Sequence, residues 1–252
     1  MKLSSGIIPN TEAWQRCRIG KITASQVSKI FVSGQGKDNL MGAGAMTYLN
    51  QKIGEILTQV MYDDVPETED ILRGLGNEQF ALERYSEITG EVVQDSLLFE
   101  YNAIACGTND GEIIYPNGEI KAILEVKAPR PHKHIQICAI DAAIELKAVD
   151  KQYYSQCQAN MMFTNSEYAD FISYNDDIKH YDLQIRIIRV YPDLQWRKEF
   201  IERINWIADY MSEKIEKILK TPERNLAYRI EKTPEAVNKL QNVLENIQSI
   251  AH

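Results

Sequence analysis

Apolar residues at helical spacing alternate along the chain with short runs at strand spacing. Thr23 followed three residues later by Gln26 fits a capping box, and the apolar spacing continues through Val27 and Ile30, so a helix is predicted to start there. Further helices are expected over residues 47–60, 74–88, 150–163 and most of 193–252, with a break near Thr221-Pro222.

Strand-like runs fall between these helices. Alternation and β-branched content predict strands over residues 91–106, 168–174 and 181–191, and a hairpin over 110–127 that turns at Pro116-Asn117-Gly118. The element order predicts an α/β fold with a mixed central sheet flanked by helices. No linker rich in Pro, Gly or Ser divides the chain, so residues 1–252 are expected to form one domain, with a core over about 14–192 and a helical segment over about 193–252.

Composition narrows the class of protein. The 252 residues are 44% hydrophobic and 25% charged, which is typical of a globular chain. The net charge of −8 argues against coating nucleic acid through overall positive charge, although it leaves room for a local basic groove. No apolar run is long enough for a signal peptide or a membrane helix, so a cytoplasmic protein without membrane contact is expected. The four cysteines lack CxxC spacing and are expected to be reduced thiols.

The hairpin brings two acidic residues together. With the turn at Asn117-Gly118, antiparallel partners have residue numbers that sum to 235, which places Asp110 opposite Glu125. Directly opposed residues have Cβ atoms roughly 4.5 to 5.5 Å apart, and two opposed anions destabilise a hairpin. A divalent cation between them removes this repulsion, and Mg²⁺ prefers oxygen ligands of this kind.

Alternation assigns the two faces of the second hairpin strand. Lys127 shares a face with Glu125, and the opposite face is expected to lie on the core and carries Ile120, Ala122, Leu124 and Val126. A Glu-x-Lys pair on a strand is often only an exposed polar face, and Asp110-Gly111 alone is an ordinary turn. The candidate site therefore depends on the conjunction of these residues.

A third acid belongs to the helix expected over residues 74–88. Glu78 lies on the apolar stripe of that helix, which is formed by Ala81, Leu82, Tyr85 and Ile88. Burying an unpaired carboxylate costs free energy, so this position calls for a partner. An exposed acid in the first helical turn is the alternative explanation.

These motifs resemble the PD-(D/E)XK nucleases, and within them the lambda-type exonucleases, or YqaJ-like viral recombinases. Asp110 with Glu125-Val126-Lys127 is similar to the D...ExK signature, and Gly74-x-x-x-Glu78 is similar to the helix acid of the family. The stretches WQRCRIGKITASQV at 14–27 and YYSQCQANM at 153–161 resemble two further motifs. One departure is Thr108-Asn109-Asp110-Gly111, where this branch commonly has Ser-Pro-Asp-Gly.

The resemblance implies a restriction-endonuclease-like core and a metal-dependent deoxyribonuclease. Mg²⁺, for which Mn²⁺ can substitute, would be held by Glu78, Asp110, Glu125 and the backbone carbonyl of Val126. Such ions lower the pKa of bound water and stabilise the attacking and leaving oxygens. Lys127 would orient the water or stabilise the transition state.

The resemblance also implies a DNA-phosphate site. By position in the motifs, Arg18 and Ser25 would hold phosphate and Gln156 would assist them. Arg18 and Ser25 lie near the helix start at Thr23, where free backbone N–H groups favour an anion. A capping or surface serine and a solvated glutamine are the alternatives. Lys121, Arg130, Lys133 and Lys151 are weaker candidates for phosphate contacts, and His132 and His134 are expected to be loop residues.

The expected function is an exonuclease that degrades linear double-stranded DNA from 5′ to 3′ and supplies single strands for phage-type recombination. In the resembled family such enzymes form ring-shaped oligomers, commonly trimers, and work with a single-strand annealing protein, in the host cytoplasm when phage-encoded. Two alternatives remain at this point. One is a PD-(D/E)XK endonuclease, and the other is a catalytically silent DNA-binding protein on the same fold, against which the four intact site residues argue.

Overall fold

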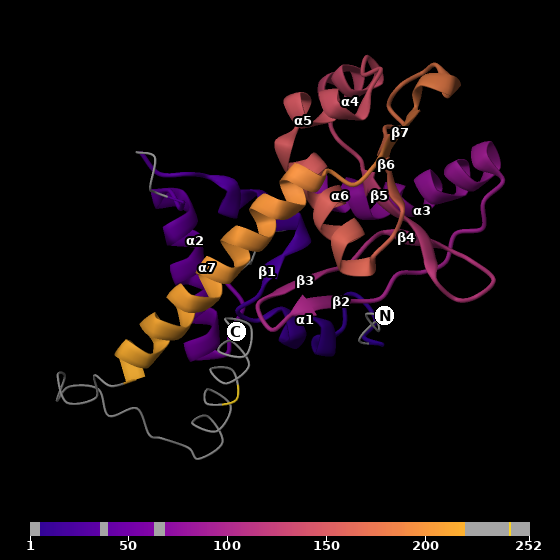
Figure 1. Cartoon of the computed structure of the whole chain (residues 1–252). Coiled ribbons are helices and arrows are strands. Elements are labelled where there is room, and N and C mark those ends of the chain that lie inside the picture. Colours follow the sequence, from indigo (N-terminus) through magenta and orange to yellow (C-terminus); the bar gives the residue numbers. More distant parts are fainter. Residues whose placement is uncertain (1–5, 36–39, 63–68, 220–241, 243–252) are drawn as a thin grey trace.

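The computed structural model describes residues 6–35, 40–62, 69–219 and 242, with the backbone alone described at 69–75 (Figure 1). The helices are α1 (Glu12–Arg18), α2 (Ala43–Thr58), α3 (Glu69–Thr89), α4 (Pro131–Cys138), α5 (Ala143–Val149), α6 (Lys151–Thr164) and α7 (Leu194–Leu219), and the 3-10 helices are η1 (Ala24–Phe31) and η2 (Tyr181–Leu183). The strands are β1 (Ile22–Thr23), β2 (Phe99–Asn102), β3 (Ala105–Gly107), β4 (Gly111–Ile114), β5 (Ile120–Lys127), β6 (Tyr168–Tyr174) and β7 (Ile185–Val190).

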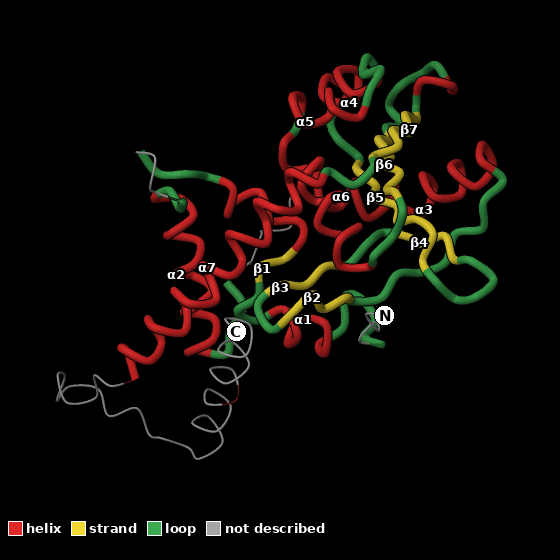
Figure 2. The backbone as a smooth tube through the Cα atoms, in the orientation of Figure 1, coloured by secondary structure: helices red, strands yellow, loops and turns green. Residues whose placement is uncertain are grey.

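The strands form two sheets, which Figure 2 shows in yellow. The larger has the order β4-β5-β6-β7, with β5 and β6 parallel and the other pairs antiparallel. The smaller has the order β1-β3-β2. The prediction of an α/β fold with a mixed sheet flanked by helices is confirmed.

The register of the predicted hairpin is confirmed at three ladder positions. Gly111 pairs with Leu124, Glu112 with Ile123 and Ile113 with Ala122, so the residue numbers of each pair sum to 235. The register shifts beyond Ile113, where Ile114 pairs with Ile120. The turn is closed by a hydrogen bond from the Gly118 N–H to the Tyr115 carbonyl (2.8 Å), and the positive φ of Gly118 is a conformation that glycine adopts at little cost.

Strand β5 is buried on both faces, whereas the sequence predicted one core face. Ala122, Leu124 and Val126 pack against α3, as expected. Ile123 on the opposite face is also fully buried and belongs to the core that contains α6. Figure 1 shows α3 and α6 on opposite sides of the sheet. The candidate site residues on this face therefore lie beneath a helix, not on an open surface.

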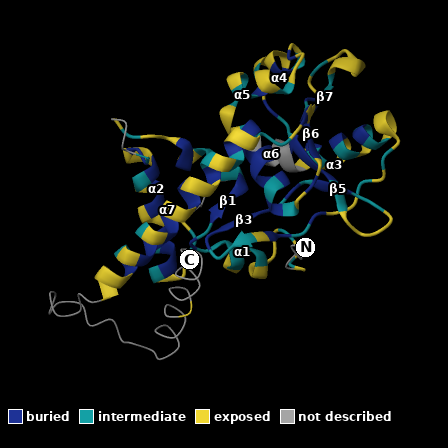
Figure 3. Ribbon diagram, viewed as in Figure 1, coloured by how far each residue is buried: buried dark blue, intermediate teal, exposed yellow. Residues whose placement is uncertain are grey.

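Helix α6 is buried around most of its circumference (Figure 3). Its buried positions include the polar residues Gln156, Gln158 and Asn160. Buried polar groups require hydrogen-bond partners. Gln158 has two, because its Nε2 donates to the Tyr191 carbonyl (2.8 Å) and its Oε1 accepts from the Asp193 N–H (2.8 Å).

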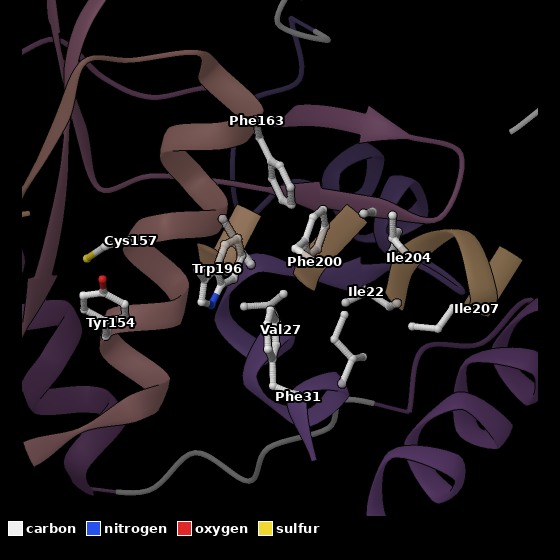
Figure 4. Packing of buried hydrophobic residues seen from close by; sticks show 14 of the residues in the cluster. Ile22, Val27, Phe31, Tyr154, Cys157, Phe163, Trp196, Phe200, Ile204 and Ile207 are labelled. Atoms are coloured by element: carbon white, nitrogen blue, oxygen red, sulfur yellow. The ribbon is translucent and has the colours of Figure 1, made fainter. Parts of the chain in front are cut away.

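Aromatic packing fixes η1 and α7 beside α6 (Figure 4). The rings of Phe31 and Trp196 are stacked with centroids 4.9 Å apart, and Trp196 stacks on Phe200 at 5.3 Å. Phe163 of α6 reaches Phe200 at 5.9 Å. Aromatic pairs at these separations add stability beyond the area that they bury. This packing joins the element that carries Ser25 to the helix that carries Gln156.

Several predicted boundaries near the N-terminus are wrong. The helix that follows Thr23 is a 3-10 helix, and the Thr23 side chain makes no capping bond to it; the Thr23 hydroxyl instead lies 3.2 Å from that of Ser25. Helices α2 and α3 begin at Ala43 and Glu69, several residues before the predicted starts. Ile88, predicted on the buried stripe of α3, is exposed.

Later elements also differ from the sequence prediction. The segment 91–106 is divided into an isolated bridge at Gln94 and the strands β2 and β3, and 181–191 begins with η2 before β7. Helices α1, α4 and α5 were not predicted, and His132 and His134 lie on α4, not in a loop. The predicted break at Thr221-Pro222 lies outside the described residues.

The boundary near residue 192 stays a prediction, as does the assignment of one domain. The buried residues of α7, among them Ile204 and Ile207, belong to the same core cluster as those of α6 and η1 (Figure 4). Within the part of the chain that the structure describes, no helix is both long enough and apolar enough to cross a membrane.

Candidate active site

Asp110 lies one residue before β4 and is tethered to β5. Its N–H donates to the Leu124 carbonyl (3.0 Å), which extends the hairpin pairing by one bond. Its side-chain Oδ2 accepts a hydrogen bond from the Val126 N–H (2.6 Å). The carboxylate therefore lies beside the backbone of the Glu125-Val126-Lys127 segment, as the predicted register requires.

Glu125 is fully buried and uses both carboxylate oxygens. Oε1 forms an ion pair with Lys127, its neighbour on the same face of β5. Oε2 accepts a hydrogen bond from the Nδ2 of Asn160 on α6 (3.1 Å). A buried carboxylate is tolerated only when it is paired and hydrogen-bonded, and these two partners meet that condition.

The acids retain protons more strongly than isolated carboxylates do. Burial and, to a smaller extent, the Asp110 charge raise the pKa of Glu78 to about 7, against the opposing effect of Lys127. The pKa of Glu125 is raised to about 8, because burial and the Asp110 charge outweigh the lowering effect of the Lys127 charge and of the hydrogen bonds from Lys127 and Asn160. Burial also raises the pKa of Asp110, against Lys127 and the Val126 N–H.

Lys127 is held as a cation. Burial lowers its pKa, but the neighbouring charges of Glu125 and Asp110 raise it more, so the net shift is upward. Its Nζ also lies 5.9 Å from the centroid of the Tyr153 ring. With an ammonium beside two carboxylates, the cluster keeps excess negative charge whenever all three acids are ionised.

The donor chemistry suits a hard divalent cation, since carboxylate oxygens surrounded by protein are the ligands such ions prefer. Burial is the main cause of the raised pKa values of Glu78 and Glu125, and the Asp110 charge adds to it, so a bound cation would favour the ionised forms of these acids. Among the described residues, however, no three Asp, Glu, His or Cys side chains are grouped closely enough to hold one ion. Asp110 and Glu125 point instead at N–H donors, so the predicted ligand set stays a prediction.

A pocket of about 590 Å³ opens beside these acids. Glu78 and Asp110 contribute to its lining, and so do all three residues predicted to hold phosphate, Arg18, Ser25 and Gln156. Glu125 and Lys127 do not line it. The pocket thus places acidic groups and potential phosphate-binding groups in one cavity, although they come from α1, η1, α3, α6 and the segment before β4.

Arg18 is oriented by an aromatic ring. Its guanidinium carbon lies 3.9 Å from the centroid of the Trp14 ring one turn earlier on α1. The Trp14 Nε1 donates to the Thr108 hydroxyl (2.9 Å), two residues before Asp110. Trp14 and Thr108 also line the pocket. The contacts link α1 to the chain segment that leads into Asp110.

Ser25 and Gln156 face the same cavity from two helices that pack together. Ser25 is partly buried, and its carbonyl accepts a hydrogen bond from Gln152 of α6 (3.1 Å). Gln156 is only 7% exposed, which argues against the alternative of a solvated glutamine. Among the described residues the Gln156 side chain shows no hydrogen-bond partner, which leaves its amide available to a ligand in the pocket.

The sequence reading missed the hydrogen-bonded support of Asp110. Asn109 donates through Nδ2 to the Glu112 carboxylate (3.2 Å), and Ser96 donates to the same oxygen (3.0 Å). The Asn109 N–H donates to the Ser96 hydroxyl (3.2 Å), which closes the network. These bonds hold the backbone at the position where the resembled branch commonly has proline. The only indication of this network in the sequence was the departure from Ser-Pro-Asp-Gly, since Asn109 stands where the resembled branch commonly has proline.

Two of the four weaker phosphate candidates are engaged in ion pairs. Lys121 pairs with Glu91 (2.7 Å) and Lys133 with Asp150 (3.2 Å).

His134 is fully buried, and its ring nitrogens lie 2.8 Å from the Ser173 hydroxyl and 2.7 Å from the Leu183 carbonyl. His134 therefore fastens α4 to the sheet.

Solved structures of other proteins share the fold of this chain. The chain is similar to an alkaline exonuclease (LHK-Exo) from Laribacter hongkongensis, with 25% identity, a TM-score of 0.67, and coverage of 83% of this chain and 97% of that one. The same enzyme in complex with dAMP gives a TM-score of 0.68 at equal identity and coverage. A phage-related exonuclease from Haemophilus somnus 129PT is 16% identical with a TM-score of 0.61 over 79% of this chain and 96% of that one, and supports the fold alone.

These neighbours confirm the predicted PD-(D/E)XK core. The similarity to the alkaline exonuclease indicates a nuclease. No curated protein sequence shows significant similarity to the chain. The family comparison covers more than half of the chain, because the profile of the YqaJ-like viral recombinase domain matches residues 13–167. This range includes both motif stretches and the whole hairpin, and the resemblance drawn from them is confirmed. The chain belongs to the YqaJ-like viral recombinase domain family.

Proposed function

We propose that this protein is a Mg²⁺-dependent exonuclease that degrades linear double-stranded DNA from its 5′ ends, with Mn²⁺ able to replace Mg²⁺. The observation that carries the proposal is the pocket that Glu78 and Asp110 share with Arg18, Ser25 and Gln156. Carboxylates suit a cation, whereas a guanidinium, a hydroxyl and an amide suit a phosphate. A cavity that joins both sets could hold a phosphate of a DNA strand beside a bound cation.

The catalytic centre is assigned to Glu78, Asp110, Glu125 and Lys127. The three acids, with the Val126 backbone carbonyl, would hold the metal, which when bound lowers the pKa of water and stabilises charge on the scissile phosphate. Lys127 supplies a fixed positive charge that orients the attacking water or stabilises the developing negative charge. Helix α6 covers Glu125 and excludes bulk water, which strengthens these electrostatic interactions.

The direction of digestion would be set by a terminal 5′ phosphate. Arg18 donates charge-assisted hydrogen bonds to phosphate, and the hydroxyl of Ser25 and the amide of Gln156 complete the contacts. The 5′-phosphorylated end would then lie beside Arg18, Ser25 and Gln156, with the first phosphodiester bond at the acids. A 5′-hydroxyl end lacks the charge that Arg18 recognises.

Digestion of linear duplex DNA labelled at either end tests the proposal. We expect loss of label from 5′-phosphorylated ends with Mg²⁺ and none with EDTA, while closed circular DNA survives. Glu125→Gln should stop the reaction. Cutting of circles would support the endonuclease alternative, and the absence of cleavage with every metal would support the silent DNA-binding alternative.

The proposal extends to a role in recombination and to the oligomeric state of the protein. A resecting enzyme leaves single strands, and an annealing protein that pairs them is the expected partner. We also propose that the protein forms a ring-shaped homo-oligomer, commonly a trimer in the resembled family, through which DNA passes during digestion. Light scattering of the purified full chain tests the oligomer, and co-purification with a candidate annealing protein expressed alongside it tests the partner.

A further inference from the structure

We propose that Asn160 is a positioning residue that sets the orientation of the Glu125 carboxylate and its distance from the segment entering Asp110. The inference rests on the proposed function, in which both acids hold the metal. Asn160 lies on α6, is 1% exposed, and is 35 residues away from Glu125 in the sequence. Asn160 lies within the motif stretch 153–161, in which the resemblance assigns a role to Gln156 alone.

The amide group of Asn160 serves two acceptors from different elements. Nδ2 lies 3.1 Å from Glu125 Oε2 on β5 and 3.2 Å from the Thr108 carbonyl, two residues before Asp110. An amide nitrogen carries two N–H donors, so one is available for each acceptor. The same side chain therefore fixes the strand that carries one acid and the segment that carries the other.

The environment fixes which end of the amide faces the acids. A reversed amide would point its carbonyl oxygen at two acceptors, so only Nδ2 fits there. The Asn160 Oδ1 faces Gly107, where a Cβ atom would lie only 2.3 Å from it. Oδ1 is buried and has no hydrogen-bond partner. An unpaired buried acceptor is destabilising, so the amide is retained at a cost, which points to a role beyond packing.

The Asn160 side chain is uncharged, which suits a group that positions a metal ligand. An ammonium or guanidinium on Oε2 would compete with a metal ion, whereas an amide orients the carboxylate without neutralising it. A carboxylate oxygen has a second lone-pair direction, so Oε2 can keep the Asn160 bond while facing a cation. Groups that hold metal ligands in this way typically change metal affinity or activity by about 10- to 100-fold when they are removed.

Gln158 on the same helix provides a matched control. It is also fully buried, and its amide also makes two hydrogen bonds, but to the Tyr191 carbonyl and the Asp193 N–H. Asn160→Leu and Gln158→Met each replace an amide by an apolar group of similar size. Both variants should lose comparable stability, so only an effect on the acids separates them.

The experiment measures Mn²⁺ binding to the full chain without DNA, from the electron paramagnetic resonance signal of free Mn²⁺. We expect Asn160→Leu to raise the Kd by roughly 10- to 100-fold, and Gln158→Met to change it by less than about threefold. The Mg²⁺ concentration for half-maximal DNA cleavage should rise in parallel for Asn160→Leu. The inference would be overturned if Asn160→Leu bound Mn²⁺ with the wild-type Kd, or if both variants showed an equal loss of Mn²⁺ affinity.

A measurement on the wild-type protein covers the case in which Asn160→Leu does not fold. On titration with Mg²⁺, the side-chain amide resonances of Asn160 should shift in ¹⁵N-resolved NMR spectra, and an unchanged resonance at saturating metal overturns the inference. Failure of the proposed function looks different. The wild-type protein would then bind no Mn²⁺ and cleave no DNA, whereas failure of the inference alone leaves both intact.

Discussion

The guanidinium carbon of Arg18 lies over the Trp14 ring, 3.9 Å from its centroid, and the Trp14 Nε1 in turn donates to the Thr108 hydroxyl. A cation stacked on an indole ring is attracted by its π electrons and loses rotamer freedom. The guanidinium is therefore oriented before any ligand arrives. Because the same tryptophan contacts the segment before Asp110, the groups proposed for phosphate and for metal share one support.

Arg18→Ala should chiefly reduce the preference for 5′-phosphorylated ends. Hydrogen bonds to charged groups contribute about 1.5–3 kcal/mol, so the ratio of cleavage rates on phosphorylated and hydroxyl ends should fall by roughly 10- to 100-fold. Initial rates on the two substrates measure this ratio. Arg16→Ala is the control, because Arg16 lies on the same helix but is exposed and pairs with Glu12. Equal loss on both ends would indicate a general DNA contact.

Loss of the ion pair between Glu125 and Lys127 should lower both the stability of the fold and the cleavage rate. Lys127→Met leaves the buried Glu125 without its charged partner, and breaking such a pair costs about 3–5 kcal/mol when both groups are buried. Lys127 is a quarter exposed, so we expect the lower end of that range. Glu125→Gln added to Lys127→Met should restore most of the stability, since no uncompensated charge remains. Chemical unfolding of the single and double variants measures the difference.

Cleavage should not recover with stability. Each single variant and the double variant should lose at least about 100-fold in rate, the lower end of the effect of removing one stabilising group from an active site. A double variant that regains wild-type cleavage would show that the pair is structural and that the site lies elsewhere.

Metal binding should stabilise the fold in the absence of DNA. A ligand at about 100 times its Kd adds about 2.7 kcal/mol to the free energy of unfolding, which for a chain of this size corresponds to roughly 5–10 °C in Tm. Thermal unfolding with Mg²⁺ or Mn²⁺ against EDTA measures the shift. Asp110→Asn should abolish it, while Glu167→Gln, which alters an exposed acid beside Tyr115, should not. A shift that survives Asp110→Asn would place the metal elsewhere.

The sequence was sufficient for the hairpin because the relevant signals are local. Asn117-Gly118 marks the turn, alternation sets the faces, and a register fixed near the turn determines which residues meet as far as Asp110. The tether from the Val126 N–H to Asp110 follows from that register. The helix acid Glu78 was located in the same way, from the apolar spacing of Ala81 and Tyr85, both of which are fully buried.

The burial of α6 and the hydrogen-bond partners of its side chains could not be predicted from local sequence patterns. A helix that alternates polar and apolar residues with little net amphipathicity looks solvated, whereas α6 is buried against the sheet, η1 and α7. The partners of its buried amides are distant in sequence, as Asn160 with Glu125 and Gln158 with Asp193 show. Only the tertiary structure brings them together. One local signal was overlooked, since Pro131 at the first position of α4 is a common helix start.

Asp193 should make the attachment of α7 sensitive to acid. It precedes α7, its Oδ1 accepts from the Trp196 N–H (3.0 Å), and its Oδ2 accepts from the Tyr154 hydroxyl (3.1 Å). Burial raises the pKa of Asp193, but these bonds and the Lys147 charge lower it more, so the net shift is downward. A carboxyl group with a lowered folded-state pKa stabilises the fold above its unfolded pKa of about 4. This contribution is lost as the pH falls through the folded value.

Asp193→Ala should therefore lower the free energy of unfolding by about 1–2 kcal/mol between pH 5 and 7, the usual effect of losing a helix cap. Below about pH 4 the difference from wild type should shrink, because protonation removes the same interactions from the wild-type protein. Urea unfolding at several pH values measures both curves. A difference that stays constant down to pH 3 would mean that Asp193 acts through the shape of its side chain and not through its charge. Because Trp196 stacks between Phe31 and Phe200, loss of this cap should also loosen η1, which carries Ser25 to the pocket.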